Sequence, residues 1–291
     1  MKEIVVVSGK GGTGKTSIAA SLAVLAGRAV LADCDVDASD LHLVMSPYII
    51  RRENFFGGKK AKIVAEKCAG CGKCIELCRF EAVFKDESSG KFGIKPTSCE
   101  GCGVCSYFCP EKAIEFKLVV NGQWFVSETS YGPMVHARLG VAEENSGKLV
   151  SRVRNEAKAI AEKKGIPFII VDGPPGIGCP VIASITGSDA VLIITEPTVA
   201  GEHDLERVAR LVDFFKIPAF LCVNKYDINP ELSKNICDKA GVWGIKVIGI
   251  IRYDRSVTGA QIEKKPVVVF SDSDVSQDIC QVWNCLKSLI N

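Results

Sequence analysis

The sequence lacks any long apolar run and any marked excess of charge of one sign. No stretch reaches the roughly 20 apolar residues that a membrane-spanning helix needs, and the opening segment, Met1 to Val7, does not have the long apolar core of a signal peptide. Its 36 Lys and Arg residues almost balance 34 Asp and Glu residues, for a formal net charge of +2. We therefore expect a cytoplasmic protein that enters no membrane and binds no nucleic acid.

The composition also has no signature of disorder. Hydrophobic residues make up 47% of the 291 positions and charged residues 24%. A chain of this length and composition can bury one large core and a second small one.

Cysteine, in contrast, is abundant, with 14 residues. Eight of them form two consecutive C-x2-C-x2-C-x3-C runs: Cys68, Cys71, Cys74 and Cys78, then Cys99, Cys102, Cys105 and Cys109. Disulfide scaffolds are typically short secreted chains, whereas this spacing in a long chain is typical of metal ligands. We therefore expect a reducing compartment and an iron–sulfur cube on each run.

Short apolar runs alternate with helical patterns along most of the chain. Residues 3–8 have the continuous apolar pattern of a strand buried on both faces, residues 16–26 are alanine-rich and helical, and a long amphipathic helix is predicted over 146–164. Further strands are predicted at 29–33, 167–171, 189–194, 218–223 and 246–251. This alternation predicts an α/β fold, a doubly wound and mostly parallel sheet with helices on both faces.

Residues 57–118 interrupt this alternation. They are rich in Gly and Cys, contain no helical pattern of ordinary length, and repeat internally, since 67–83 matches 98–114. The offset is constant, 99 − 68 = 109 − 78 = 31, which indicates two halves related by pseudo-twofold symmetry. We predict a small α+β domain at 57–118, inserted into a larger domain formed by residues 1–56 and 119–291.

The first strand runs directly into a phosphate-binding loop. Residues 9–16, GKGGTGKT, fit G-x4-G-K-[ST] between a strand and a helix, a context that argues against a purely structural turn. In such loops backbone N–H groups face the phosphates; here Lys15 would meet the β- and γ-phosphates and Thr16 would ligate Mg2+. The predicted nucleotide contacts in this segment are Gly9, Lys10, Gly11, Gly12, Thr13, Gly14, Lys15, Thr16 and Ser17.

The spelling KGGTGKT, with its extra lysine Lys10, resembles the deviant Walker A loop of the MinD/ParA/Mrp and nitrogenase-iron-protein class of P-loop NTPases (SIMIBI type). The resemblance implies that Lys10 reaches the nucleotide of a facing subunit in an ATP-bound homodimer or in a heterodimer with a related ATPase. A cation arriving in trans would stabilise charge on the transferring phosphoryl group. The alternative is a solvated lysine on a loop.

Acidic residues follow two predicted strands, where open α/β sheets bind ligands. Asp172 is placed as the Walker B acid that holds Mg2+ through water, and the Pro-Pro-Gly turn after it looks like the switch II segment of the same class. The resemblance makes Asp35 the switch I carboxylate that orients or activates the attacking water. The predicted catalytic residues are therefore Lys10, Lys15 and Asp35, while Asp33, Asp37 and Asp40 remain open between site residues and surface carboxylates.

The segment Asn224-Lys225-Tyr226-Asp227 follows another predicted strand and could read a base edge. It also fits the guanine-recognition spelling N-K-x-D, so it does not by itself decide between ATP and GTP. The loop spelling and the Pro-Pro-Gly turn favour ATP, with Asn224 contacting adenine as in the resembling class.

The two cysteine runs resemble a bacterial-type ferredoxin with two [4Fe–4S] clusters, over about residues 61–117. The resemblance implies that the last cysteine of each run crosses over. One cube would be held by Cys68, Cys71, Cys74 and Cys109, and the other by Cys99, Cys102, Cys105 and Cys78. Zinc is the competing interpretation, which the duplicated spacing disfavours. One departure is that Pro110 follows Cys109, whereas Arg79 follows Cys78.

Two further residues invite a functional interpretation. Cys179 lies seven residues after Asp172, similar to a bridging-cluster cysteine of the nitrogenase iron protein, although plain packing is the simpler reading. His136 lies in a segment, YGPMVHARLG, that resembles MinD-superfamily ATPases with an inserted ferredoxin domain. We expect a structural or solvated loop histidine there.

Together these patterns predict a Mg-ATP-binding and ATP-hydrolysing iron–sulfur protein. A nucleotide-driven dimer switch would be coupled to electron transfer or to cluster delivery to a redox or cluster-accepting protein. Two alternatives stay open: a MinD-like spatial or regulatory ATPase whose clusters sense redox state, and a ferredoxin-type electron carrier whose nucleotide site is structural.

Overall fold

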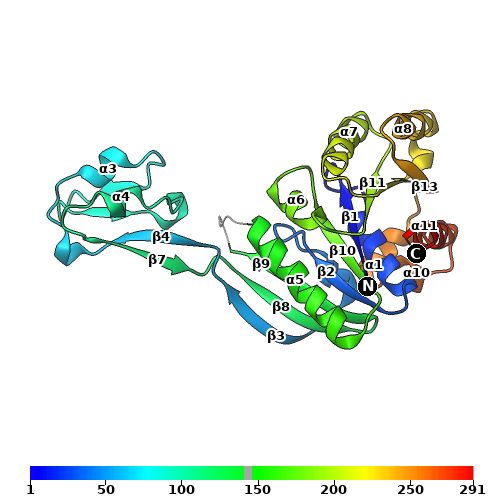
Figure 1. Cartoon of the computed structure of the whole chain (residues 1–291), viewed down its shortest axis with the longest axis horizontal. Helices are drawn as coiled ribbons and strands as arrows, with labels where there is room; N and C mark the ends of the chain where they lie inside the picture. Colours follow the sequence, from blue (N-terminus) through cyan, green and yellow to red (C-terminus); the bar gives the residue numbers. More distant parts are fainter. Residues whose placement is uncertain (141–145, 291) are drawn as a thin grey trace. The chain divides into compact units, whose positions relative to one another are not determined.

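The computed structural model describes residues 1–140 and 146–290, which divide into two compact units (Figure 1). The first unit comprises Met1–Glu53, Trp124–Arg138 and residues 146–290. The second comprises Asn54–Gln123 with Leu139 and Gly140. The interruption predicted at 57–118 falls inside the second unit.

Within the described residues, the first unit is built on a nine-stranded sheet with the order β13-β12-β11-β1-β10-β2-β9-β8-β3. Its strands are β1 (Lys2–Ser8), β2 (Ala29–Asp33), β3 (Tyr48–Phe55), β8 (Gly122–Thr129), β9 (Gly132–Leu139), β10 (Phe168–Pro175), β11 (Ala190–Thr195), β12 (Ala219–Asn224) and β13 (Lys246–Ile251). Pairing is parallel from β13 through β12, β11, β1, β10 and β2 to β9. The predicted α/β fold with a mostly parallel sheet is confirmed.

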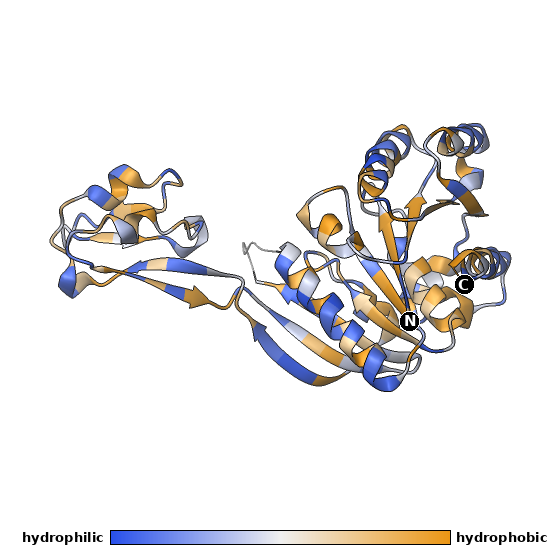
Figure 2. Ribbon diagram, viewed as in Figure 1, coloured by the Kyte–Doolittle hydropathy of each residue, from blue (hydrophilic) through white to orange (hydrophobic). Residues whose placement is uncertain are grey.

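Helices cover both faces of the sheet because successive residues of a strand point to opposite sides. Ile4 and Val6 of β1 join a core cluster with α1 (Lys15–Leu25) and α11 (Asp274–Ile290). The opposite face is covered by α5 (Ser146–Lys164) and α6 (Cys179–Ile185), which also pack on each other. The other helices of this unit are α2 (Leu41–Met45), α7 (Val199–Phe214), α8 (Pro230–Val242), α9 (Ser256–Ile262) and α10 (Val267–Phe270), and η3 is a 3-10 turn (Tyr226–Ile228). Figure 2 shows apolar central strands and an alternation of polar and apolar residues along α5.

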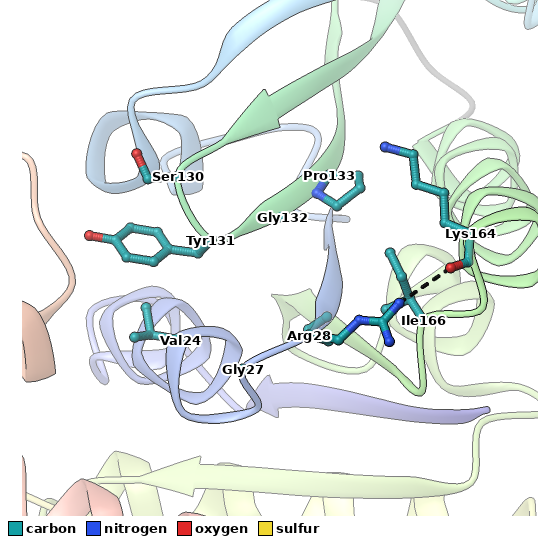
Figure 3. A pocket seen from close by; sticks show the side chains of 10 residues that line it. Val24, Gly27, Arg28, Ser130, Tyr131, Gly132, Pro133, Lys164 and Ile166 are labelled. Atoms are coloured by element: carbon teal, nitrogen blue, oxygen red, sulfur yellow. Dashed lines mark hydrogen bonds between the residues drawn. The ribbon is translucent and has the colours of Figure 1, made fainter.

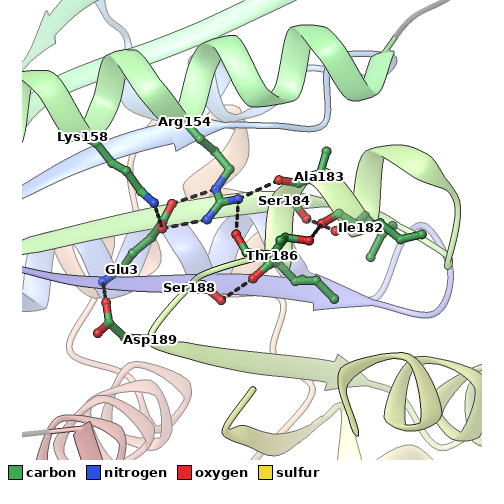
Figure 4. Close-up of polar contacts among 11 residues, drawn as sticks. Glu3, Arg154, Lys158, Ile182, Ala183, Ser184, Thr186, Ser188 and Asp189 are labelled. Carbon is green, nitrogen blue, oxygen red and sulfur yellow. Dashed lines mark hydrogen bonds and ion pairs between the residues drawn. The ribbon is translucent and has the colours of Figure 1, made fainter. Parts of the chain in front are cut away.

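A buried ion pair ties three elements of the first unit together (Figure 4). Arg154 of α5 donates to both carboxylate oxygens of Glu3 on β1, at 2.8 and 2.7 Å. Its third nitrogen donates to the carbonyl oxygens of Ala183 and Thr186 at the end of α6. Because Lys158 also reaches Glu3 at 2.9 Å, the buried charges are fully paired and fix α6 against the sheet.

The second unit contains two short antiparallel pairs. The strand β4 (Gly58–Ile63) pairs with β7 (Ile114–Val119), and β5 (Val83–Lys85) pairs with β6 (Phe92–Ile94). Two helical turns, α3 (Lys73–Leu77) and α4 (Val104–Tyr107), and two 3-10 turns, η1 (Ala65–Lys67) and η2 (Pro96–Ser98), begin 31 residues apart, since 104 − 73 = 96 − 65 = 31. The repeat predicted from the sequence is therefore confirmed in the backbone.

No helix among the described residues combines the length and the apolar character needed to cross a membrane.

Candidate functional site

The phosphate loop leads from β1 into α1, and buried contacts hold its backbone. Gly14 adopts φ +89°, and a Cβ there would lie 2.4 Å from the Asn224 side-chain nitrogen. That nitrogen, Nδ2, donates to the Thr13 carbonyl at 2.7 Å. Only glycine fits this close approach with a left-handed backbone. Asn224 therefore stabilises the backbone of the phosphate loop through its hydrogen bond to Thr13. The contact of Asn224 with adenine stays a prediction.

Lys15 lies between the two predicted carboxylates. Its Nζ is 3.4 Å from Asp35 Oδ2 and 3.9 Å from Asp172 Oδ1, and the side chain is 7% exposed. Chain topology explains this meeting, because β1, β2 and β10 are neighbours and end at the same edge. The structure thus brings together Lys15, Asp35 and Asp172 as the sequence predicted.

Asp172 is a buried carboxylate with little to balance its charge. Burial raises its pKa to about 6, and Lys15 offsets only part of that effect. Within the described residues neither carboxylate oxygen has a hydrogen-bond partner. The nearby Thr16 hydroxyl also lowers this pKa. Carboxylate and hydroxyl oxygens are the ligands that Mg2+ prefers, so Asp172 and Thr16 fit the predicted magnesium role.

Asp33 is a correction to the sequence analysis, which allowed it to be a surface carboxylate. Its side chain is fully buried, and the Asp33 backbone on β2 lies in register beside Asp172 on β10. The Asp33 side chain accepts hydrogen bonds from Ser39 Oγ at 2.7 Å and from the Asp35 and Leu41 backbone N–H groups. Burial, and then the neighbouring Asp172, raises the pKa of Asp33 well above its usual range. Asp33 therefore shapes the loop that presents Asp35.

Asp35 keeps a raised pKa because burial outweighs the opposing effect of Lys15. Asp37 and Asp40 are exposed, as the surface alternative expects, although Asp40 also lines the cleft beside the loop.

A cleft of about 470 Å3 opens beside the phosphate loop. It is lined by Gly11, Gly12, Gly14, Lys15, Thr16, Ser17, Asp35, Ala38, Asp40, Leu43, Val44, Pro175 and Gln261. Most of the predicted loop contacts therefore face one space, with backbone N–H groups and a cation at one end and carboxylates nearby. This arrangement suits a Mg-bound polyphosphate.

Lys10 forms contacts within its own chain with a residue that sequence reasoning missed. Its Nζ forms an ion pair with Glu196, just past the end of β11. Lys225 binds the other oxygen of the same carboxylate. Burial would raise the pKa of Glu196, but the two lysines hold it below its usual range. The available signal was the position of Glu196 at the carboxyl end of a predicted strand.

A second hollow of similar size lies away from these residues, beside the start of β2 (Figure 3). The polar side chains of this hollow include Tyr131 and Arg28. Arg28 donates hydrogen bonds to the backbone carbonyls of Lys164 and Gly165. Lys164 itself pairs with Glu128 at 2.5 Å. Both cationic side chains of this hollow, Arg28 and Lys164, therefore already have partners within the protein.

In the second unit, cysteines from both runs border one hollow. It is lined by Cys68, Cys71 and Cys74 of the first run together with Cys109 of the second. The remaining lining residues are Ile63, Ala69, Gly72, Lys73, Phe92, Pro110, Glu111, Ala113 and Ile114. The last cysteine of the second run thus stands beside the first three of the first run.

The cysteines of the second run match those of the first in exposure, with Cys102, like Cys71, the exposed one. Cys99 and Cys102 lie near enough to raise the pKa of Cys105, after the larger effect of its burial. Burial alone would also raise the pKa of Cys78, but the backbone N–H groups of residues 80–83 lower it below its usual range. The Ala113 N–H likewise lies 3.3 Å from Cys109 Sγ. Backbone N–H groups thus favour the thiolate of Cys78, and one backbone N–H group donates to Cys109 Sγ.

Within residues 1–140 and 146–290, no three His, Cys, Asp or Glu side chains converge as the ligands of a single metal ion would. Of the other cysteines, Cys34 and Cys222 are fully buried and Cys179 is exposed at the start of α6.

His136 lies on strand β9, so its predicted loop location was wrong, whereas the structural role that was expected as one alternative agrees with its burial. It stacks on Phe125 and its Nε2 lies 3.0 Å from Ser127 Oγ. Burial, with a smaller effect of His42, lowers its pKa to about 4. His136 is therefore a neutral core residue.

The chain is similar to known proteins over nearly its whole length. The chain is 33% identical to an uncharacterized protein of Methanocaldococcus jannaschii, over 99% of this chain and 97% of that one. A second uncharacterized protein of the same organism is 28% identical over 79% and 82% of the two chains. The septum site-determining protein MinD from Pyrococcus horikoshii, solved with Mg-ADP, has the same fold, with a TM-score of 0.60, 18% identity and coverage of 99% and 96%. Residues 4–267 match the CobQ/CobB/MinD/ParA nucleotide binding domain, and the chain belongs to that family.

Proposed function

We propose that this protein binds and hydrolyses Mg-ATP in a dimer and that nucleotide binding is coupled to electron transfer or cluster delivery by two [4Fe–4S] clusters in the second unit. The observation that carries the proposal is the presence in one chain of two sites with independent support. One is the loop that places Lys15 between Asp35 and Asp172. The other is the hollow that Cys109 shares with the first cysteine run.

The nucleotide reaction needs positioning and charge more than covalent chemistry. Loop N–H groups and Lys15 would bind the phosphates, and Lys15 would exchange its contacts with the two carboxylates for phosphate oxygens. Asp172 and Thr16 would hold Mg2+, which supplies charge neutralisation at the phosphates. Asp35 would then be free to orient water, and Lys10 of a facing subunit would complete the site.

The hollow that Cys109 shares with the first three cysteines of the first run supports a crossed arrangement of two cubes. Cys68, Cys71, Cys74 and Cys109 would hold one and Cys99, Cys102, Cys105 and Cys78 the other, supplying one-electron redox chemistry when bound. The chain's own contribution is the set of backbone N–H donors around Cys78, which favour its thiolate, and the Ala113 N–H that donates to Cys109 Sγ.

Two measurements test this function. Anoxically purified protein should contain iron and acid-labile sulfide in amounts that match two cubes, and zinc in their place would contradict the cluster assignment. The Lys15→Ala variant should lose both nucleotide binding and Mg-ATP hydrolysis. The Lys10→Ala variant should still bind the nucleotide but hydrolyse it more slowly. Equal turnover of the Lys10→Ala variant would remove the argument for action in trans.

A further inference from the structure

The carboxylate of Glu196 holds both lysines that border the phosphate loop. Its Oε1 lies 2.6 Å from Lys10 Nζ, and its Oε2 lies 3.0 Å from Lys225 Nζ. Lys10 Nζ also donates to Thr198 Oγ1 at 3.0 Å, and Lys225 Nζ donates to the Gly12 carbonyl at 3.1 Å. Each carboxylate oxygen thus serves a different cation, and each cation has a second acceptor.

The acceptors of Lys10 belong to a rigid part of the first unit. Thr198 caps α7, because its hydroxyl accepts the Gly201 N–H at 3.0 Å. The Glu196 carbonyl lies so close to Gly201 that a Cβ there would be 2.4 Å away. The side chains of Lys10 and Glu196 are 29% and 14% exposed, so water screens this ion pair less than a surface pair.

We propose that Glu196 is a positioning residue that retains Lys10 beside its own phosphate loop, so that Lys10 must leave Glu196 before it can act in a facing subunit. The inference rests on the proposed function, in which Lys10 acts in trans. Glu196 and Thr198 already use two of the three N–H donors of the Lys10 ammonium, so reaching the phosphates of a facing subunit would require Lys10 to give up contacts that it makes here. Dimer formation therefore exchanges one ion pair for another, and Glu196 sets the cost of that exchange.

The first experiment measures dimer formation. Sedimentation velocity with Mg-ATP over a range of protein concentrations would compare wild type, Lys10→Ala, Glu196→Gln and the double variant. Glu196→Gln should lower the concentration of half-dimerisation about 3- to 10-fold, the range expected for loss of a partly screened ion pair. In the Lys10→Ala background, Glu196→Gln should leave the concentration of half-dimerisation unchanged. Glu202→Gln, which removes the ion pair with Lys239 and weakens a hydrogen bond from Asn235, is the matched control, because among the described residues Glu202 forms no ion pair or hydrogen bond with Lys10.

The second experiment reads the retention of Lys10 without any dimer. In nucleotide-free protein, the acylation rate of the Lys10 amine, followed by mass spectrometry, should rise several-fold in Glu196→Gln and stay unchanged in Glu202→Gln. Glu196→Asp, whose shorter side chain cannot span both lysines, provides a second variant should the glutamine variant not fold. Unchanged Lys10 reactivity in the folded variant would overturn the proposal.

Glu196 binds both Lys10 and Lys225, and a substitution of Lys225 separates the retention of Lys10 from an effect on the shape of the phosphate loop. Lys225→Met should weaken nucleotide binding through the Gly12 carbonyl without lowering the concentration of half-dimerisation. A lowered concentration in that variant would show that loop shape, not retention of Lys10, controls assembly. A wild-type chain that stays monomeric with Mg-ATP overturns the proposed function, whereas a dimerising wild type with an unchanged Glu196→Gln variant overturns the role of Glu196 alone.

Discussion

The two units of this protein place their functional residues by different physical means. In the first, the site follows from topology, since the neighbouring strands β1, β2 and β10 carry Lys15, Asp35 and Asp172 to one edge of a deeply buried sheet. In the second, strands are short, and the buried apolar side chains between residues 54 and 123 are Ala61, Ala82, Val83, Ala113 and Ile114. A core this small contributes little stability by itself. The comparison predicts that the first unit can hold its site empty, whereas the second would depend on the clusters proposed for its cysteines.

The largest effect that tests this contrast is expected on removal of iron. Chelation under reducing conditions should unfold the second unit, because ligand binding then supplies most of its folding free energy. Hydrogen exchange of residues 54–123 should rise to the rate of an unfolded chain. Tryptophan fluorescence should stay unchanged, since Trp124, Trp243 and Trp283 all lie in the first unit. Continued protection of β4 and β7 after iron loss would break the comparison.

The crossed ligand sets provide the next test. In a background with Cys99, Cys102 and Cys105 changed to Ala, one cube should remain. Adding Cys109→Ser should remove that cube, because Cys109 lines the hollow of the first run, while adding Cys78→Ser should leave it. Iron and sulfide analysis with EPR spectroscopy measures both. Loss of the remaining cube with Cys78→Ser instead would show uncrossed sets.

The two halves of the repeat differ at one pair of glycines. Gly70 and Gly101 both have positive φ, but a Cβ at Gly101 would lie 2.1 Å from the Lys59 carbonyl, against 3.9 Å for the nearest atom at Gly70. Gly70→Ala should cost about 1 kcal/mol, the cost of a left-handed alanine. Gly101→Ala should cost about 2–4 kcal/mol, because backbone must also move. Rates of cluster loss in denaturant compare the two variants, and equal rates would contradict this account.

The first unit can be tested through the pH dependence of its buried histidine. The folded pKa of His136, about 4, lies below the ordinary value of 6.5. The unfolded chain therefore binds more protons between these values, and the contribution of His136 to stability falls as pH falls from 6.5 to 4. Relative to His136→Gln, wild type should lose roughly 2 kcal/mol over this window. Urea unfolding followed by tryptophan fluorescence measures the difference, with His203→Gln as an exposed control, and a pH-independent difference would show that His136 is not buried neutral.

The sequence predicted best what depends on neighbouring residues. Continuous apolar runs placed β1, β2 and β13 within a residue of their observed ends, and the cysteine offset of 31 predicted the repeated helical turns. The phosphate loop also followed from its own spelling. Strands β3, β8 and β9 were missed. Of these, β3 is an exposed edge strand rich in charge, so it gives no continuous apolar pattern.

What depends on distant partners was not visible. Glu196 and Lys10 are 186 residues apart, and only the folded sheet brings them together. The same holds for Asn224 and the Thr13 carbonyl, 211 residues apart, and for the burial of Asp33. In each case a polar residue at a strand end was recognisable, but its partner was set by strand order.

The most direct test of coupling between the two units is the reduction potential of each cluster with and without Mg-ATP. The account predicts that Mg-ATP shifts at least one potential by about 60 mV or more, which is a tenfold coupling for a one-electron step. The shift should vanish in Lys15→Ala, whose clusters remain intact. Identical potentials in wild type with and without Mg-ATP, with the nucleotide shown to be bound, would contradict it.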